Sequence, residues 1–499
     1  MKKFFLYLTL LILVIIGSVY SVLFTGWGNG VVSGIISDKI NEEKVIVFTF
    51  DKFLVSTNKI DIVANIDSNS KINISGDYSL LGASADIKYD INIKDLTKLQ
   101  KITGKKLKGS FSLSGIAVGN KELMNVQGKT NIFSSKTTYD IKMINFEPSF
   151  IQVQVLKARI QDALVMLEEP AYAKGYLDIN MDIKNAQIGT LDGMIITKVY
   201  QGLVNNPVVN KAFDLKLVDK LTFKTTIITK LKNDLALSSL KTYTSKANVF
   251  VKEAKVNLRT QKINSDYKIV VSDLRKLFDV SGTKMRGAIT IDGNFVKDEN
   301  ILVDGKSKLL KGTLNYKLLN DDFTASIKNI DLLKGLYMMY YPEVFNSSAS
   351  IDLVYNLKDQ KGLMTAILKD GQLVKSDYSS QINALTRFDL TKEVYEETTL
   401  ESKINKNIIN SIMHLKSKHT TLDMTQSVLD TLKNTTDSTI KVNIKGLKFD
   451  TIIKGNLNDP SIKIKLDAKA ALKSKIDEKK KVYKEKLENK LRDKLKSLF

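Results

Sequence analysis

The residue types that most often carry out chemistry in proteins are scarce in this chain. Its 499 residues include no cysteine and two histidines, His414 and His419. Disulfide bonds, iron–sulfur clusters and thiol nucleophiles are therefore excluded, and little is left for metal ligation or imidazole catalysis. His414 stands near a predicted strand with no partner nearby in the sequence, which favours a surface position over a catalytic one.

Motifs that bind phosphate or metal ions are present only in part. The segment 104–110 (GKKLKGS) has the glycine spacing of a phosphate-binding loop, but no lysine follows its second glycine. The acidic clusters at 292–294 and 321–322 do not fit a twelve-residue calcium loop, so solvated turn carboxylates are the simpler interpretation. No pair among the 54 acidic residues stands out as general acid and base. We therefore expect no enzyme activity, no catalytic residue, no metal site and no cofactor.

The positive charge of the chain is spread out, with one exception. The formal net charge is +22, yet no arginine-rich or stacking aromatic motif accompanies it, so a nucleic-acid partner is not expected. Residues 469–499 alone carry 12 Lys or Arg and 5 Asp or Glu, a net of +7. We predict a basic amphipathic helix over 466–499 that binds anionic head groups or an acidic partner. A solvated helix that caps the last strand is the alternative. The apolar stripe of this helix is Leu472, Ile476, Tyr483, Leu487, Leu491, Leu495 and Phe499.

The first 24 residues predict a membrane anchor. Lys2 and Lys3 precede 21 uncharged residues, enough for a helix to cross a hydrocarbon layer of ~30 Å. A cleaved signal peptide is the alternative, but its apolar region is usually shorter, and no clear small-x-small cleavage site follows. Because lysines favour the cytoplasmic side, we expect a single-pass inner-membrane protein with the bulk of the chain in the periplasm.

Beyond the anchor, apolar and polar residues alternate from end to end of the chain. This period of two is typical of strands with one apolar and one polar face. Buried parallel strands would be apolar on both faces, so the pattern favours an antiparallel sheet. The clearest segments are 60–66, 72–74, 87–93, 177–183, 351–357, 440–444 and 462–466.

One stretch of the sequence occurs twice. Residues 89–115 (YDINIKDLTKLQKITGKKLKGSFSLSG) and 267–293 (YKIVVSDLRKLFDVSGTKMRGAITIDG) align without a gap and are identical at ten of 27 positions. Such a match indicates a reused structural unit. Within it the apolar period changes from two to three or four, which predicts a strand, a short helix, a glycine stop and a second strand. Looser copies are expected around Leu164 and Leu333.

A sheet with one apolar face must cover that face. The sequence predicts no long helix between Gly30 and Gly189 that could do so, and a surface helix over 189–210 that is interrupted at Pro207. We therefore expect the sheet to curl onto itself. If the curl stays open, its apolar lining can solvate acyl chains while lipid head groups stay in water. For any single apolar position, an ordinary closed core is the alternative. The candidate groove residues are Ile62, Ile74, Ile91, Ile93, Phe111, Leu113, Ile289, Ile291, Ile351 and Leu353.

Three features together resemble the AsmA-like family, relatives of TamB. They are the segment 24–40 (FTGWGNGVVSGIISDKI), the repeated stretch, and the segment 455–467 (GNLNDPSIKIKLD). The last carries the most weight, because a strand, a turn with Asp459 and Pro460, and a final alternating strand before a basic helix are similar to the C-terminal end of that family, here about 370–465.

The resemblance implies a fold and a function. The expected fold is mainly β: an elongated, curled antiparallel β-sheet groove (repeating β-groove) with short helices, one N-terminal transmembrane helix and a C-terminal amphipathic helix. The anchor would occupy 1–24, the groove 25–465 and the basic helix 466–499. The implied function is to carry phospholipid between the inner and outer membranes, with an outer-membrane or envelope protein as a further partner. The alternative is a non-enzymatic scaffold that assists outer-membrane assembly.

Overall fold

The computed structural model describes residues 23–42, 47–67, 69–100, 107–187, 189–457 and 459–466. The anchor predicted over 1–24 and the amphipathic helix predicted over 466–499 lie almost wholly outside these residues. Both therefore stay predictions. Within the described part of the chain, no helix is long and apolar enough to cross a membrane.

The fold is mainly β. The described residues form 26 strands that belong to one antiparallel sheet, together with a few short helices. The mainly β, antiparallel class with short helices is thus confirmed. The chain divides into two compact units, unit 1 (Met1–Asp266) and unit 2 (Tyr267–Phe499). The boundary falls within β14 (Ile263–Val271).

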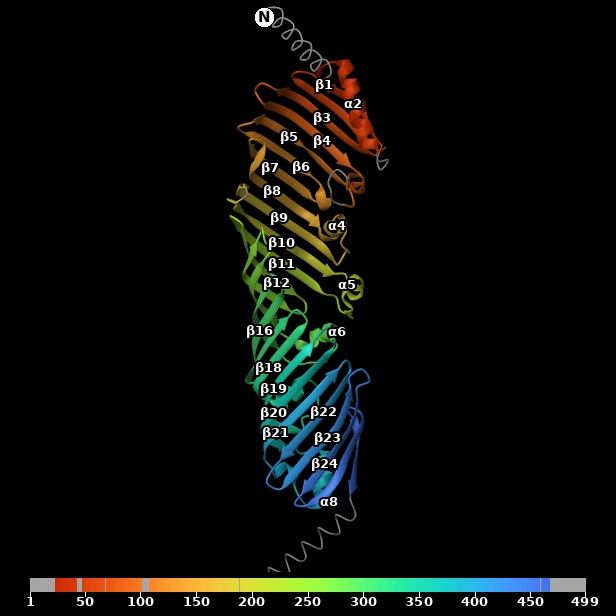
Figure 1. Cartoon of the computed structure of the whole chain (residues 1–499), viewed down its shortest axis with the longest axis vertical. Coiled ribbons are helices and arrows are strands. Elements are labelled where there is room, and N and C mark those ends of the chain that lie inside the picture. Colours follow the sequence, from red (N-terminus) through yellow and green to blue (C-terminus); the bar gives the residue numbers. More distant parts are fainter. Residues whose placement is uncertain are drawn as a thin grey trace, which may run out of the picture. The chain divides into compact units, whose positions relative to one another are not determined.

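Unit 1 is a meander in which each strand pairs with the next one in the sequence. Its connections are short. Between β7 and β8, for example, Asn145 and Phe146 both have positive φ, as a two-residue turn between twisted strands requires. Figure 1 shows the strands in sequence order, with α4 (Ile160–Met166) and α5 (Asn206–Phe213) along one margin. The strands are β1 Phe48–Val55, β2 Lys59–Ile66, β3 Ser70–Ser79, β4 Ser84–Ile93, β5 Phe111–Asn120, β6 Met124–Thr130, β7 Lys136–Ile144, β8 Glu147–Arg159, β9 Ala173–Asn185, β10 Asp192–Val204, β11 Thr222–Lys232, β12 Leu235–Thr244 and β13 Asn248–Asn257.

Unit 2 repeats this arrangement with its own strands, again each paired antiparallel with the next from β15 to β26. The strands are β15 Ile289–Lys297, β16 Ile301–Leu309, β17 Gly312–Leu319, β18 Asp322–Asp331, β19 Phe345–Asn356, β20 Lys361–Leu373, β21 Tyr395–Asn405, β22 Ile408–Lys416, β23 Thr420–Asp430, β24 Thr435–Ile444, β25 Leu447–Asn456 and β26 Asp459–Leu466.

Helix α2 (Gly26–Asn41) covers the free edge of β1. The side-chain amide of Asn41 donates to the carbonyl of Phe48 at 2.9 Å and accepts from its N–H at 2.7 Å. Asn29 bonds in the same way to both backbone groups of Val55. The helix thereby pairs part of an edge that would otherwise be open to another strand.

Helix α2, which extends to Asn41, also corrects the expectation that no long helix lies between Gly30 and Gly189. It has 16 residues, and its Ile36 and Ile40 pack against the buried cluster around Ile66 and Ile93. Its glycines lower the local helix propensity, so the helix is hard to predict from the sequence. It is stabilised by the hydrogen bonds of its asparagines to β1 and by the burial of its two isoleucines.

The repeated stretch opens a longer structural repeat. In unit 1 the repeat runs from β4 through η1 (Leu96–Leu99), β5 to β8 and α4 to β9. In unit 2 it runs from β14 through η3 (Leu274–Leu277), α6 (Phe278–Ser281), β15 to β18 and α7 (Leu332–Met338) to β19. The predicted order of strand, short helix, glycine and strand is confirmed in unit 2, where Gly282 ends α6 in the left-handed conformation. Helices α4 and α7, at the places where looser copies were expected, belong to this same repeat.

The helix predicted over 189–210 is wrong. Residues 192–204 form β10, in which Ile195 pairs with Met181 on one side and with Thr229 on the other. Pro207 lies in the first turn of α5 instead of interrupting a helix, a position where its missing N–H costs nothing. Pairing on both sides decides the structure of a segment whose sequence fits helix and strand about equally.

Candidate functional site

The strands of unit 1 place their apolar side chains on one face, called the inner face below. Side chains alternate along a strand, so cross-strand partners share a face. Two unbroken rows of partners cross β2 to β13, and neither contains a charged residue. The first is Ile62, Ile74, Tyr89, Gly115, Gly128, Tyr139, Val153, Met181, Ile195, Thr229, Ser238 and Ala254; the second is Ala64, Ile72, Ile91, Leu113, Thr130, Thr137, Val155, Ile179, Thr197, Ile227, Leu240 and Val251.

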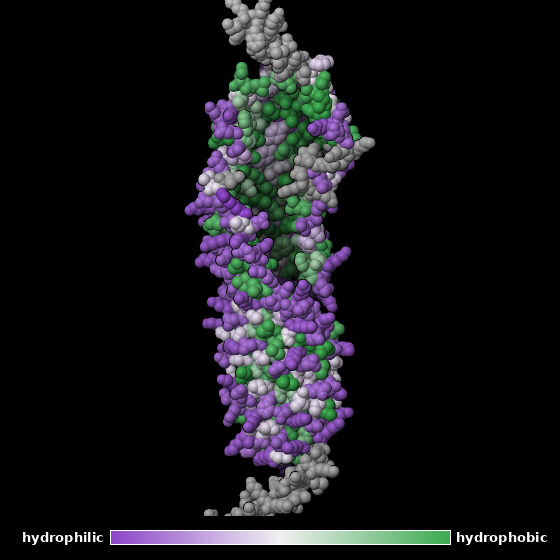
Figure 2. Space-filling view, viewed as in Figure 1, coloured by the Kyte–Doolittle hydropathy of each residue, from purple (hydrophilic) through white to green (hydrophobic). Residues whose placement is uncertain are grey.

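The opposite face of the same strands, the outer face, is mostly polar. One row of partners on it passes from Asn73 through Asp90, Ser114 and Lys129 to Thr138. Figure 2 shows a hollow in the viewed face of unit 1, with a hydrophobic floor and hydrophilic rims. The strands therefore separate an apolar concave surface from a solvated one.

Six of the ten predicted groove residues lie on the inner face of unit 1. Ile62 pairs with Ile74, Ile91 with Leu113, and Ile93 with Phe111. Five of the six are half-buried. Ile93 differs, because it is 1 % exposed and packs in a cluster with Leu96 and Met166. It belongs to the closed margin of the sheet and does not line an accessible surface.

The other four predicted residues lie on the corresponding inner face of unit 2. Ile351 pairs with Ile327 and Leu353 with Ala325. Ile289 and Ile291 alternate with Gly293 along β15. All four predicted residues are half-buried. Ile351 and Leu353 each belong to an uncharged row of partners. The two rows are Ser307, Leu314, Ile327, Ile351, Ala366, Leu400, Met413, Met424, Ile440, Thr451 and Ile464, and Gly293, Gly305, Tyr316, Ala325, Leu353, Met364, Ser402, Ser411, Ser427, Ser438, Ile453 and Ile462.

A tyrosine pair lies across two glycines on the inner face of unit 1. The hydroxyls of Tyr89 and Tyr139 are 2.7 Å apart. A Cβ atom on Gly115 would lie 2.5 Å from the Tyr89 hydroxyl, and one on Gly128 would lie 2.2 Å from the Tyr139 hydroxyl. Only glycine leaves room for the rings, so the four residues form a flat bridge across β4 to β7. Burial, followed by the hydrogen bond to Tyr89, raises the pKa of Tyr139 far above its ordinary value.

Unit 2 contains the same bridge. Tyr267 and Tyr316 join their hydroxyls at 2.6 Å over Gly293 and Gly305. The Tyr267 hydroxyl also donates to the carbonyl of Asp304 at 2.7 Å. Tyr89 and Tyr267, and Gly115 and Gly293, are identical positions of the repeated stretch, but the sequence does not show that each tyrosine lies against its glycine across strands.

Other polar groups on the inner face satisfy one another. Hydroxyl pairs link Thr229 with Ser238 at 2.8 Å in unit 1, and Ser402 with Ser411 and Ser427 with Ser438 at 2.7 Å in unit 2. Because each pair lies on adjacent strands, the hydroxyls bond to each other instead of requiring water. The inner face therefore presents methyl, methylene and ring carbon over most of its rows.

The inner faces of the two units are covered differently. In unit 2, α8 (Asp377–Thr386) and η4 (Leu390–Lys392) bury Ile382 and Leu390 completely in a cluster with Tyr395, Leu415 and Phe449. In unit 1 the central strands have no buried cluster of this size among the described residues. A helix therefore fills part of the concave side of unit 2, while much of that of unit 1 stays accessible.

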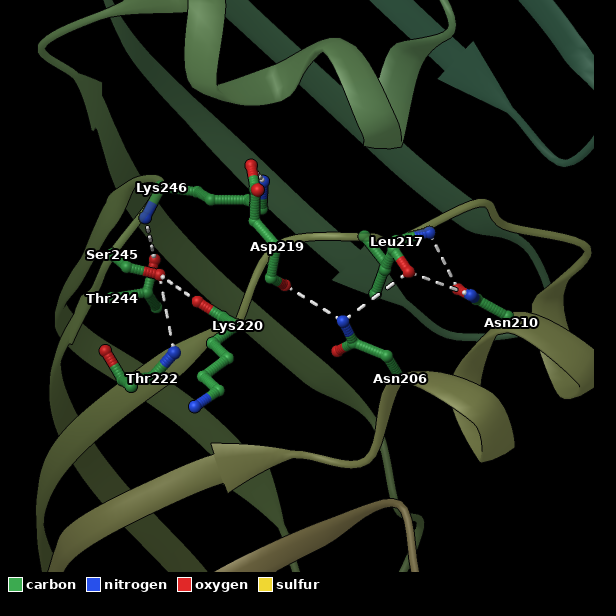
Figure 3. Close-up of polar contacts among 9 residues, drawn as sticks. All are labelled: Asn206, Asn210, Leu217, Asp219, Lys220, Thr222, Thr244, Ser245 and Lys246. Carbon is green, nitrogen blue, oxygen red and sulfur yellow. Dashed lines mark hydrogen bonds and ion pairs between the residues drawn. The ribbon is translucent and has the colours of Figure 1, made fainter.

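A fixed loop follows α5 on the margin of unit 1 (Figure 3). Asn210 accepts a hydrogen bond from the N–H of Leu217 at 2.9 Å and donates to its carbonyl at 3.0 Å. Asn206 donates to the carbonyl of Asp219 at 2.9 Å. The ammonium of Lys246, a side chain that is 6 % exposed, lies 3.6 Å from the carboxylate of Asp219. These contacts bury Leu217 and hold the loop in one conformation.

Titratable side chains with a possible role in catalysis meet at few places in the described residues. The Nδ1 of His419 lies 3.0 Å from the carboxylate of Glu393, which also contacts the hydroxyl of Ser417, but this group stands away from the inner rows. No cluster of His, Asp and Glu among the described residues could hold a metal ion. His414 is exposed on the outer face, where its Nδ1 contacts the carboxylate of Asp423. This surface pair lies on the face opposite its sequence neighbours Met413 and Met424, which belong to an uncharged inner row. No ionisable side chain other than tyrosine stands on the inner rows.

No family model, no curated protein and no solved structure matches this chain significantly.

Proposed function

We propose that this protein is a membrane-anchored periplasmic member of the AsmA-like family that carries phospholipid along its inner faces between the inner and outer membranes. One observation carries the proposal. Two uncharged rows of mostly half-buried residues cross twelve consecutive strands of unit 1 and are backed by a polar outer face. An acyl chain lying along these rows exchanges contact with water for contact with side-chain carbon.

The hydrophobic effect is large enough to hold such a cargo. Burial of one methylene group contributes ~0.8 kcal/mol, so ten methylenes contribute about 8 kcal/mol before the entropy of ordering is subtracted. With strands ~4.8 Å apart, the rows of unit 1 extend about 50 Å, longer than the hydrocarbon core of a bilayer. Because the binding energy is spread evenly, a chain can slide along the rows without breaking any specific bond.

The ends of the sequence supply the membrane contacts in this proposal. The anchor predicted at 1–24 holds the chain in the inner membrane, and the basic tail predicted at 466–499 meets anionic head groups or an acidic partner. The chain would then act without an enzymatic step, which agrees with its poor supply of catalytic side chains.

Site-specific photocrosslinking in living cells tests the proposal. A photoreactive amino acid is placed at Leu113 or Met181 on the inner face, and at their outer-face neighbours Ser114 or Asp182. We expect phospholipid adducts, detected by mass spectrometry of the purified full-length chain, at the two inner positions only. Equal adducts at inner and outer positions, or none at the inner ones, would refute lipid carriage.

A charged residue introduced on the inner face distinguishes the lipid-carrying function from the scaffold function. Aspartate at Ile91 places a short charged group among apolar side chains, where it loses hydration. Its matched control is Ser114→Asp on the outer face of the next strand. We expect Ile91→Asp to keep the thermal unfolding midpoint near that of the control but to lose co-purified phospholipid and function. A folded variant with unchanged lipid content and function would favour the scaffold that assists outer-membrane assembly.

A further inference from the structure

The two copies of the structural repeat place a cation at the same backbone position. Lys108 in unit 1 and Arg286 in unit 2 occupy equivalent positions of the repeated stretch, each one residue before a glycine with φ near +100°. The backbone N–H of Lys108 donates to the carbonyl of Met166 at 3.0 Å, and that of Arg286 donates to the carbonyl of Met338 at 2.8 Å. The cation of each copy is therefore fixed beside the end of the partner helix, α4 or α7.

The surroundings of the two cations differ in charge. In unit 1, the carboxylate of Glu168, two residues after Met166, lies 3.3 Å from the Lys108 ammonium and neutralises it. In unit 2, Tyr340 stands two residues after Met338. Glu168 and Tyr340 have the same unusual backbone conformation, with φ of 62° and 61°. The backbone conformation at this position is thus the same in both copies, but the side chain is a carboxylate in unit 1 and an aromatic ring in unit 2.

The Arg286 guanidinium is held between aromatic rings without a carboxylate. Its central carbon lies 3.7 Å from the ring centre of Tyr340 and 4.0 Å from that of Tyr337. Its Nε is buried and has no hydrogen-bond partner among the described residues. The neighbouring Arg275 is different, because Asp273 accepts its Nε and Nη2 hydrogens at 2.9 to 3.1 Å. Arg286 has no such anionic partner among the described residues.

We propose that Arg286, clamped by Tyr337 and Tyr340, binds the phosphate of a phospholipid head group at the margin of unit 2. A guanidinium offers a planar fork of N–H donors that matches two phosphate oxygens. The rings cover its faces, which leaves its edges for the ligand and reduces competition from water. Ile289 and Ile291 follow Arg286 by three and five residues and begin the inner face of β15. A phosphate at Arg286 therefore leaves the acyl chains close to the apolar rows.

This inference deepens the proposed function and rests on it, so the experiment separates the two. The full-length chain in nanodiscs is titrated with short-chain phosphatidylglycerol, with a diacylglycerol of the same chains, and with inorganic phosphate. We expect Arg286→Gln to weaken phosphatidylglycerol binding about 10-fold, the loss typical of a charge-assisted hydrogen bond. Lys108→Gln is the matched control and should leave the affinity unchanged, because Glu168 already neutralises that cation.

A second variant recreates the ion pair of unit 1 within unit 2. Tyr340→Glu should fold normally, since Glu168 adopts the same backbone conformation in the other copy, and it should also weaken phosphatidylglycerol binding about 10-fold. Wild-type affinity in both Arg286→Gln and Tyr340→Glu would overturn the inference. Inorganic phosphate that binds as tightly as phosphatidylglycerol would overturn the assignment to a lipid.

The crosslinking at Leu113 serves as the independent readout. If adducts form at Leu113 while Arg286→Gln binds normally, the head-group site fails and lipid carriage stands. If Leu113 gives no adducts, the proposed function itself fails.

Discussion

The tyrosine bridge of unit 1 allows a quantitative test of how the inner face is built. Tyr89 and Tyr139 share one hydroxyl–hydroxyl bond of 2.7 Å. A hydrogen bond of this kind contributes about 0.5–1.5 kcal/mol net. Tyr89→Phe and Tyr139→Phe each remove the same bond, so the double variant should cost much less than the sum of the two single variants. We expect a coupling energy of about 1 kcal/mol from this double-mutant cycle.

The glycines beneath the bridge should be more sensitive than the hydroxyls. A Cβ on Gly115 would lie 2.2 Å from the backbone carbonyl oxygen of Gln127 as well as against Tyr89. The backbone cannot move aside as a side chain does, so Gly115→Ala should cost about 1–3 kcal/mol. Removing the ring by Tyr89→Ala should not rescue it, because the contact with Gln127 remains.

Thermal and urea unfolding of the full-length chain measure both effects, with hydrogen exchange of peptides from β4 to β7 as the local readout. For a unit of this size, 1 kcal/mol corresponds to roughly 2–4 °C in midpoint. A coupling energy near zero, together with a neutral Gly115→Ala, would show that the bridge does not stabilise the sheet and would refute the reasoning.

Three further predictions follow from individual contacts and a fourth from the predicted topology. Gly30→Ala in α2 should raise stability by about 1 kcal/mol in urea unfolding, because no atom lies within 4 Å of the added Cβ and alanine favours the helix. Asn210→Ala should speed amide exchange at Leu217, whereas Asn206→Ala should not, because only Asn210 accepts that N–H. The pKa of Asp352 is lowered below its ordinary value of 3.8 by hydrogen bonds from Lys328 and Ser326, and that of Asp331 by its backbone bond to Lys334. The folded state then binds fewer protons than the unfolded state. The stability that these carboxylates contribute is therefore present above about pH 4 and is lost as the pH falls through their lower folded pKa values. The difference between the urea midpoints at pH 6 and pH 3 should be smaller in Asp352→Asn than in the wild-type chain. A C-terminal alkaline phosphatase fusion should be active, and activity only from a cytoplasmic reporter would contradict the predicted topology.

Alternation in the sequence was sufficient to predict the antiparallel sheet, several of its strands and the side on which their apolar residues lie. Ile62, Ile91 and Leu113 share a face because the period of two is a local property of each strand. The segment 192–204 was misassigned because local pattern does not record that β9 and β11 pair with both of its edges. Helix α2 was missed for a similar reason, since its amide bonds to Phe48 and Val55 join segments 7 to 26 residues apart.

Cross-strand contacts account for what the sequence could not predict in the candidate site. Tyr139 lies 50 residues from Tyr89, and only the register of four strands brings their hydroxyls together. The burial of Ile382 against β20 to β25 likewise depends on where α8 returns to the sheet. A pattern of residue types gives the face on which a side chain lies, whereas the cover over that face is a tertiary property.

The duplication within the chain separates what the fold requires from what it leaves free. Both copies keep two tyrosines over two glycines, and both keep the backbone bond from the cation to the methionine that ends the partner helix. In these shared features the backbone lies very close to a tyrosine ring or to another backbone segment, and few other residue types fit in that space. The residue beside the cation is not restricted in this way, because Glu168 in one copy and Tyr340 in the other have the same backbone φ. The two units can acquire different ligands at a position that the fold does not constrain. Arg286, whose neighbour is a ring, is therefore available to a head-group phosphate, whereas Lys108 is already paired with Glu168.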